Sequence, residues 1–205
     1  MSGNIGISGS FIQPQVLSCR RSLDLFIDQK YFSQLLLYHE NAYSLKMVKA
    51  IPEGYHSITP YLVVNDAAAA IDFYKRAFEA RETYRLHGPD GKSIINAELK
   101  IGDSIVLLSD EFPQGGCRSP KSIGGSAVTL HIYTEDVDKV FNQAISAGAT
   151  IVMPITDMFW GDRYGELKDP FGHIWSMATH KQDLSQEEIQ KAGEAAFKEM
   201  AKSKG

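Results

Sequence analysis

The sequence predicts an α+β fold built from two tandem βαβββ units that form a curved, cup-shaped mixed sheet. The first observation is an internal repeat, because the strand-like run that begins at Thr59 returns seventy residues later at Thr129. The second is an acid in the same place of both copies, Asp66 and Asp136, directly before an amphipathic helical pattern. The third is that three further strand-like runs follow each helix, separated by turn residues.

The first unit begins with a strand after Thr59 and continues with a helix. We expect Asp66 to cap this helix, because a carboxylate at a strand-to-helix turn accepts hydrogen bonds from the free N–H groups of the first helical turn. Apolar residues such as Ile71 and Tyr74 mark the buried stripe of the helix. The three strands expected next are Glu82 to His87, Ser93 to Lys100 and Ser104 to Ser109, with Gly-rich turns between them.

The second unit repeats this order. Asp136 is the expected cap of its helix, and Phe141 and Ala147 take the places of Ile71 and Ala77 in the first copy. Asp169-Pro170-Phe171-Gly172 is a turn in which proline presets φ and glycine accepts a positive φ. The expected strands are Thr150 to Pro154, Arg163 to Lys168 and His173 to Thr179.

Three segments are expected along the chain. Residues 1–46 are interpreted as an N-terminal extension, either flexible or a mis-annotated start, because Met47 resembles a natural chain start. Residues 47–182 form the folded domain, with units at about 54–112 and 126–180 joined by a connector at 113–125 that is rich in Gly, Pro and Ser. Residues 183–205 predict a C-terminal amphipathic helix with a capping box.

Composition excludes several classes of protein. The 205 residues carry 21 Lys and Arg against 25 Asp and Glu, so the net charge of −4 gives no general footprint for nucleic acid. Two cysteines are too few for a disulfide framework or a cysteine-based zinc site. No apolar run approaches the ~20 residues of a membrane span. We therefore expect a cytoplasmic protein without nucleic-acid or membrane partners.

Several short motifs identify a family resemblance over about residues 54–180. Thr59-Pro-Tyr-Leu-Val-Val, Ile71-Asp-Phe-Tyr-Lys, Phe159-Trp-Gly-Asp-Arg-Tyr-Gly and Lys168-Asp-Pro-Phe-Gly-His are the clearest. With the repeat, they resemble the vicinal oxygen chelate superfamily, which includes glyoxalase I, bleomycin-resistance proteins and extradiol dioxygenases. The subgroup is the one often labelled 3-demethylubiquinone methyltransferase-like, of the phosphonate-operon type. The resemblance implies a ligand in the concave sheet face and a homodimer.

The resemblance also implies a divalent metal, held by one residue on the first strand and one on the fourth strand of each unit. Those positions fall at Thr59, Leu107, Thr129 and Ser176, and none is a usual ligand of Zn, Ni, Mn or Fe. No metal is therefore expected in the standard positions. A relocated site with Glu98 and His131 remains open.

Glu98 and His131 are the candidate catalytic residues. A carboxylate and an imidazole on the concave face could serve as base and acid, or as relocated metal ligands. The alternative is that His131 is a hydrogen-bonded wall residue and that Glu98 pairs with Arg85 or Arg163.

A wider set of side chains is expected to line a ligand pocket. Trp160 could cover a flat ligand and Arg163 could hold its oxygen atoms, whereas in the structural alternative Arg163 pairs with Asp162 or Glu166. The expected pocket residues are Thr59, Tyr61, Asn96, Leu107, Thr129, Trp160, Arg163 and Ser176.

Three functions remain open at this stage. The first is a protein that binds or transforms a small organic molecule without the standard metal ligands, and the second is a metal-dependent lyase or isomerase of glyoxalase type. The third is a non-catalytic structural or regulatory dimer. The sequence does not decide whether the protein is an enzyme.

Overall fold

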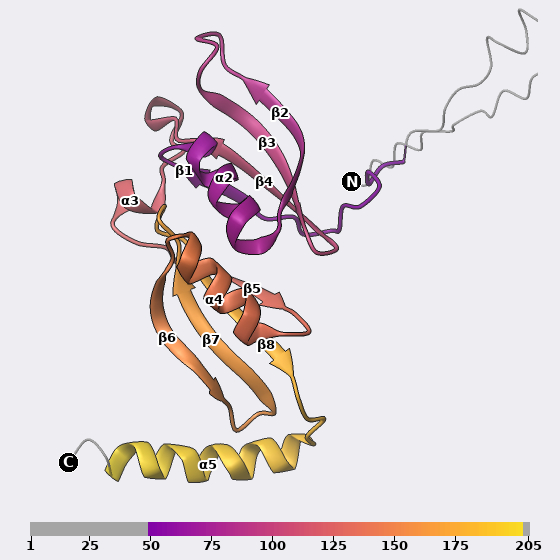
Figure 1. The fold of residues 1–205 in the computed structure, drawn as a ribbon, viewed down its shortest axis with the longest axis vertical. Helices are drawn as coiled ribbons and strands as arrows, with labels where there is room; N and C mark the ends of the chain where they lie inside the picture. The colour runs from indigo at the N-terminus through magenta and orange to yellow at the C-terminus, as the bar shows by residue number, and fades with distance from the viewer. Residues whose placement is uncertain (1–48, 203–205) are drawn as a thin grey trace, which may run out of the picture. The chain divides into compact units, whose positions relative to one another are not determined.

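The computed structural model describes residues 49–202, and it confirms the predicted α+β class. The first unit contains β1 (Tyr61–Val64), α2 (Ala67–Phe78), β2 (Arg81–His87), β3 (Ile94–Ile101) and β4 (Ser104–Asp110) (Figure 1). The second contains β5 (Thr129–Tyr133), α4 (Val137–Ala147), β6 (Thr150–Asp157), β7 (Asp162–Lys168) and β8 (Ile174–His180). A last helix, α5, spans Gln186–Lys202.

The strands form two four-stranded sheets of the same topology. Their orders are β1-β4-β3-β2 and β5-β8-β7-β6, and no ladder joins the two sheets among the described residues. In each sheet the first strand pairs in parallel with the last strand of its unit, while the other pairs are antiparallel. The parallel pairing requires a crossover, and in each unit this crossover contains the helix and the two intervening strands.

The predicted aspartate caps open both helices. The Asp66 carboxylate accepts a hydrogen bond from the Ala69 N–H at 2.9 Å, and Asp136 accepts from the Lys139 N–H at 3.0 Å. Each acid thereby satisfies a donor that has no partner inside its helix. The repeat seen in the sequence therefore corresponds to a repeated strand-to-helix turn.

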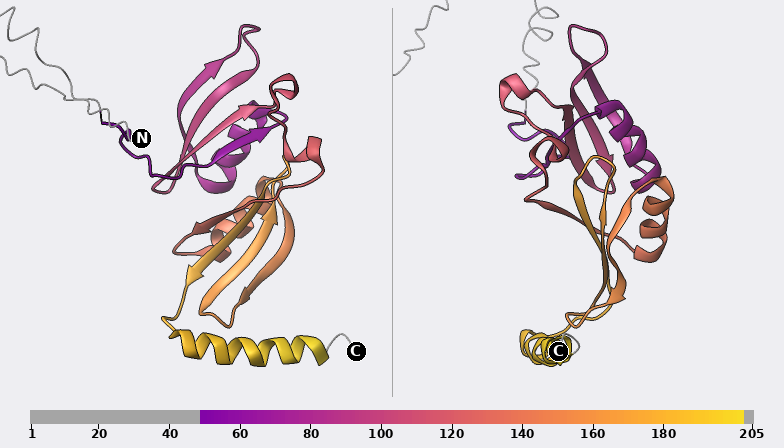
Figure 2. Two further views of the ribbon diagram at one scale, coloured as in Figure 1. Left: turned by 180° about the vertical axis from the view of Figure 1, so that it is seen from behind. Right: turned by 90° about the vertical axis from the view of Figure 1, so that its left-hand side faces the viewer.

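Each sheet has one face covered by its helix and one face without a helix (Figure 2). Successive side chains of a strand point to opposite faces, so the strand residues divide into two sets. The helix-covered faces and the helices supply the buried core, which includes Leu62, Ile71, Phe73, Leu99, Leu108, Phe141, Leu167, Trp175 and Met177. The helix-free faces keep several large side chains exposed, including Tyr61, Tyr84, Leu86 and Tyr133.

A buried carboxylate connects the two units. Asp169, 4% exposed, lies in the turn between β7 and β8 and accepts a hydrogen bond at 2.7 Å from the Tyr74 hydroxyl of α2. The indole N–H of Trp175 donates to the same carboxylate at 2.9 Å, and so do the backbone N–H groups of Phe171 and His173. The turn thus has an architectural role that extends across both units.

The connector between the units contains short helical turns that its Gly-, Pro- and Ser-rich sequence did not predict. It contains a 3-10 turn, η1 (Pro113–Gly115), and a short helix, α3 (Pro120–Ile123). Ser119 caps α3 and donates its own backbone N–H to Glu111 at 2.9 Å. Proline at the first helical position and glycine directly after the helix explain these short bounds.

The predicted capping box begins the C-terminal helix. The Ser185 N–H donates to Glu188 at 2.8 Å, and the Glu188 N–H donates to the Ser185 hydroxyl at 3.3 Å. The interpretation of residues 1–46 lies outside the described residues. Within 49–202, no helix is long and apolar enough to cross a membrane.

Replacing Tyr74 with Phe should destabilise the fold. The change removes one donor from the buried Asp169 carboxylate while keeping the packed ring, and hydrogen bonds to charged groups contribute about 1.5–3 kcal/mol. Urea denaturation should show a loss of free energy of unfolding within that range. The matched control is Tyr84→Phe, at an exposed tyrosine of a helix-free face, and an equal effect of both variants would contradict this role of Asp169.

Candidate functional site

A cleft of about 780 Å³ lies on β5, next to the segment before β1 and the turn between β3 and β4. Its volume falls in the range typical of small-molecule sites. Its wall is largely apolar, with Ile58, Ile101, Ile105, Val106, Val128, Leu130 and Ile132. The polar members include His56, Thr59, Thr129 and His131, so three of the predicted site residues share this cleft.

His131 is held in place by the parallel pairing of β5 with β8. The register sets His131 opposite Ser176, and the imidazole Nδ1 lies 2.7 Å from the Ser176 hydroxyl oxygen. Burial lowers the pKa of His131 below its ordinary 6.5, and the more weakly acting charge of Asp162 opposes this shift. The neutral imidazole is thus favoured, with one ring nitrogen a donor and the other an acceptor.

Aromatic rings continue from His131 along the helix-free face. The His131 ring centroid lies 4.6 Å from that of Tyr133 and 6.0 Å from that of Tyr164, and Trp160 meets Tyr164 edge-on at 5.6 Å. We call Tyr133, His131, Tyr164 and Trp160 the aromatic row. Trp160 is among the pocket residues that the sequence predicts, and Tyr164 is not. The spacing of two residues between Asp162, Tyr164 and Glu166 along one strand nevertheless places all three on one face.

Two carboxylates lie beside the aromatic row. Glu166 accepts the Tyr164 hydroxyl at 2.5 Å, and the buried Asp162 accepts the Trp160 indole N–H at 3.2 Å. His180 Nδ1 lies 2.7 Å from Asp162. Hydrogen bonds to Asp183 first, and then to Asp162, raise the pKa of His180.

The helix-free face of the first sheet carries four of the other predicted residues, namely Glu98, Leu107, Tyr61 and Asn96. Glu98 lies in one cross-strand row with Tyr84, Leu107 and Tyr61. Its carboxylate accepts hydrogen bonds from the hydroxyls of Tyr55 and Thr83. One position along the same face, the buried Asn96 Oδ1 accepts no hydrogen bond from any residue that the structure describes.

Arg163 pairs with acids other than the two that the sequence suggested. Its guanidinium pairs with Asp138 of α4 through bonds of 2.6 and 2.7 Å and with Asp157 at 3.2 Å. These carboxylates raise the pKa of Arg163. The alternative pairing with Asp162 or Glu166 is wrong, because strand alternation turns Arg163 toward the helix and those two acids toward the other face.

The proposed partners of Glu98 are also wrong. Arg85 pairs with Glu82 at 2.5 Å on the helix side of the sheet, and Arg163 pairs in the second unit as described. Within residues 49–202, no hydrogen bond or ion pair joins Glu98 to His131. The two candidate catalytic residues thus belong to separate clusters, one on each sheet.

The described residues do not fit the divalent metal that the resemblance implies. The four expected positions hold Thr59, Leu107, Thr129 and Ser176, whose side chains provide hydroxyls or an alkyl group. In the observed register Thr129 lies opposite Ile174, and the imidazole beside Ser176 comes from His131. Across residues 49–202, no group of three His, Cys, Asp or Glu side chains is placed to hold a metal ion.

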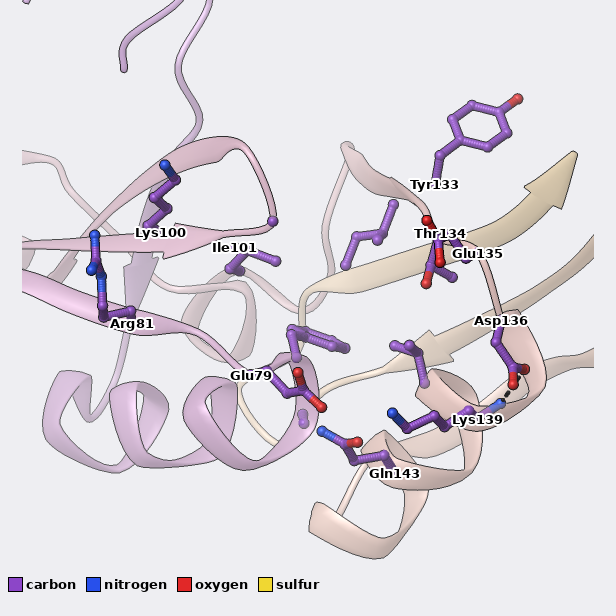
Figure 3. Close-up of a pocket in the computed structure, with 15 residues that line it drawn as sticks. Glu79, Arg81, Lys100, Ile101, Tyr133, Thr134, Glu135, Asp136, Lys139 and Gln143 are labelled. Atoms are coloured by element: carbon purple, nitrogen blue, oxygen red, sulfur yellow. Dashed lines mark hydrogen bonds between the residues drawn. The ribbon is translucent and has the colours of Figure 1, made fainter. Parts of the chain in front are cut away.

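A second cleft, of about 680 Å³, lies near the end of α2 and the start of α4 (Figure 3). Its charged side chains have both signs: Arg81, Lys100 and Lys139 are positive, and Glu79, Glu135 and Asp136 are negative. This mixed lining lacks the large apolar wall of the cleft beside His131. It is therefore the weaker candidate for an organic ligand.

Comparison with known proteins places these features in a family. The model of the Glyoxalase/Bleomycin resistance protein/Dioxygenase superfamily matches residues 54–177. An uncharacterized protein of Mycobacterium bovis is 48% identical over 139 residues, which cover 66% of this chain and 91% of that protein.

Solved structures resemble the same part of the chain. The X-ray structure of an Arabidopsis thaliana gene product (At5g48480) has 30% identity and a TM-score of 0.50, covering 60% of this chain and 98% of that one. A Bacillus cereus structure titled as a putative 3-demethylubiquinone-9 3-methyltransferase, PhnB protein, has 19% identity and a TM-score of 0.49, covering 60% and 99%.

The pKa values of His131 and His180 should move in opposite directions from 6.5. NMR titration of the imidazole resonances, assigned with His131→Gln and His180→Gln, should place His131 below and His180 above that value. Asp183→Asn should bring the pKa of His180 back toward 6.5, because Asp183 is the largest cause of its shift. A His131 that titrates above 6.5 would contradict the partial desolvation of its imidazole beside Ser176.

The signs of the linked stability changes follow. The folded state binds the His131 proton more weakly than the unfolded chain does. The contribution of His131 to the free energy of unfolding is therefore full above pH 6.5 and is lost as the pH falls below that value. The contribution of His180 is full below pH 6.5 and is lost as the pH rises through its raised pKa. The difference in free energy of unfolding between the wild type and each glutamine variant, measured by urea denaturation at several pH values, should show these opposite slopes.

Proposed function

We propose that this chain, which belongs to the Glyoxalase/Bleomycin resistance protein/Dioxygenase superfamily, binds a small organic molecule with a planar aromatic part in the cleft beside His131. The observation that carries this proposal is the junction of a largely apolar cleft with the aromatic row. His131 belongs to both, so a ligand seated in the cleft would extend across exposed ring surface.

The geometry of the rings supports a planar ligand. The centroid distances within the aromatic row are 4.6 to 6.0 Å, which are spacings of edge-to-face and offset aromatic contacts. Hydrogen bonds from Tyr164 to Glu166 and from Trp160 to Asp162 hold two of these rings in position. A ligand ring would add to an array that is already oriented.

The charges near the row favour a neutral or cationic ligand. Glu166 and Asp162 lie on this face, and neither makes an ion pair with a lysine or arginine among the described residues. His131, with its lowered pKa, adds no full positive charge near neutral pH. An anionic ligand would therefore meet the negative charge of Glu166, whereas Asp162 is paired with His180.

The relocated glyoxalase-type site receives less support from the geometry. Its base and acid, Glu98 and His131, make their hydrogen bonds in different sheets of the chain. His131 instead has the environment of a neutral wall residue that can exchange one hydrogen bond with a ligand. Binding is thus the function that these contacts support best.

Proflavine, a planar aromatic cation, should bind saturably and more tightly than the anion 1-anilinonaphthalene-8-sulfonate. Tyr164→Ala should weaken proflavine binding about fivefold, since an aromatic pair contributes about 1 kcal/mol beyond area burial. The measurement is a fluorescence anisotropy titration of each dye. His131→Ala should give a similar loss.

The matched control for this titration is Phe197→Ala. Phe197 is an aromatic residue of α5 that is 62% exposed and does not line the cleft. This variant should bind proflavine as the wild type does. Absence of saturable binding by both dyes, or equal losses in the control and in Tyr164→Ala, would contradict the proposal.

We also propose that a second copy of the chain covers part of this surface. Ile58, Val128 and Tyr133 are 87%, 66% and 63% exposed, and all three line the cleft. Exposed apolar groups clustered around one site are typical of association surfaces. Membership in the superfamily agrees with a homodimer.

Sedimentation equilibrium tests the homodimer. The wild-type chain should sediment as a dimer, and Ile58→Asp with Val128→Asp should shift it toward monomer by placing charges in an apolar interface. Phe197→Asp, which places a charge on an exposed side chain away from the cleft, should leave the mass unchanged. A wild-type monomer at high concentration would contradict the dimer.

A further inference from the structure

We propose that the Tyr55 side chain occupies a ligand subsite at Glu98 and stands in for a ligand that donates an aromatic hydroxyl group. The inference deepens the proposed function and rests on it, because it assigns a chemical group to the molecule bound on the helix-free side. The subsite consists of Glu98, Thr83 and Asn96 with the flanking rings of Tyr61 and Tyr84.

The contact itself is the first argument. The Tyr55 hydroxyl donates to one Glu98 carboxylate oxygen, while the Thr83 hydroxyl donates to the other. Hydrogen bonding to Glu98 raises the pKa of Tyr55 to about 12. No lysine or arginine pairs with Glu98 among the described residues. The described hydrogen bonds to its carboxylate all come from hydroxyl groups.

The surroundings of Glu98 resemble a binding surface more than a packed core. Tyr61 and Tyr84 lie in the same cross-strand row and are 49% and 48% exposed. Asn96, two residues before Glu98 on the same strand, leaves a buried acceptor oxygen without a described partner. The face therefore offers exposed rings beside the carboxylate. A second acceptor, covered by its neighbours, lies about 7 Å from the first by strand geometry.

The segment that delivers Tyr55 has few attachments of its own. Residues 49–60 form no helix or strand. Their described local hydrogen bonds are those from Tyr55 N to Pro52 O at 3.2 Å and from Thr59 Oγ1 to His56 O at 3.3 Å. The segment is anchored at its end, where Pro60 O accepts from the Leu107 N–H of β4 at 2.9 Å. Tyr55 can thus leave Glu98 without breaking a sheet ladder.

The same segment links the subsite to the cleft. His56 and Thr59 line the cleft beside His131, while Tyr55 reaches Glu98 on the first sheet. Displacement of Tyr55 by a ligand hydroxyl would therefore move residues that form the cleft wall. A phenol that binds at Glu98 would therefore compete with the Tyr55 hydroxyl and alter the wall of the cleft.

Chemical replacement of the side chain tests this assignment. Tyr55→Gly should bind 4-methylphenol, which is the tyrosine side chain as a free molecule, about tenfold more tightly than toluene, which lacks the hydroxyl. The wild type should bind 4-methylphenol about tenfold more weakly than Tyr55→Gly does. Binding is measured by ligand-observed NMR titration on the full chain, after circular dichroism has shown that the variant is folded.

Adding Glu98→Leu to Tyr55→Gly should remove the preference for 4-methylphenol over toluene. Glu199→Leu in the same background, which removes an exposed carboxylate of α5, is the matched control and should keep that preference. Equal binding of the two probes by Tyr55→Gly, or equal binding of 4-methylphenol by wild type and variant, would overturn the assignment. Proflavine binding tests the cleft separately. Its absence would contradict the proposed function, whereas equal binding of 4-methylphenol and toluene would contradict only the assignment of the subsite.

A second measurement decides the matter if Tyr55→Gly does not fold. Ultraviolet titration of the wild type should show a tyrosine that ionises near pH 12 and that shifts toward 10 in Glu98→Gln. Tyr55→Phe identifies that transition by its disappearance. Ionisation of Tyr55 near 10 in the wild type would show that its hydroxyl does not occupy Glu98, and the proposal would fall.

Discussion

The arrangement of the two units depends on the hydrogen bonds to the Asp169 carboxylate. This carboxylate accepts hydrogen bonds from Tyr74 of the first unit and from Trp175 and two backbone N–H groups of the second. A buried carboxylate without such donors would be costly, so the turn that carries it and the helix that meets it must keep their places. The helix-covered faces are buried by this packing, and the opposite faces stay accessible to a ligand.

Strand alternation then decides which side chains can serve that ligand. Asp162, Tyr164 and Glu166 lie on the helix-free face, while the intervening Arg163 turns toward α4 and pairs with Asp138. The contact between His131 and Ser176 likewise results from the parallel register of β5 with β8. Sheet geometry therefore places Tyr133, His131 and Tyr164 of the aromatic row. Trp160 instead lies in the turn between β6 and β7, beside Gly161, whose φ is 98°.

The repeat and its aspartate caps made the fold class predictable, because Asp66 and Asp136 mark the same local turn twice. The site was less accessible to sequence reasoning. The order of residues along β7 does not show which neighbouring acid Arg163 meets, since Asp138 lies on a distant helix. Tyr55 was missed because it precedes the first strand, and only the tertiary path of residues 49–60 brings it to Glu98.

The central claim is that an organic ligand binds at the junction of the cleft and the aromatic row. The most direct measurement is a ¹H–¹⁵N NMR titration of the labelled chain with proflavine, mapped residue by residue. The account predicts that the largest shift changes fall on Thr129, His131 and Tyr164. Changes confined to α5, or to the helix-covered faces, would contradict it.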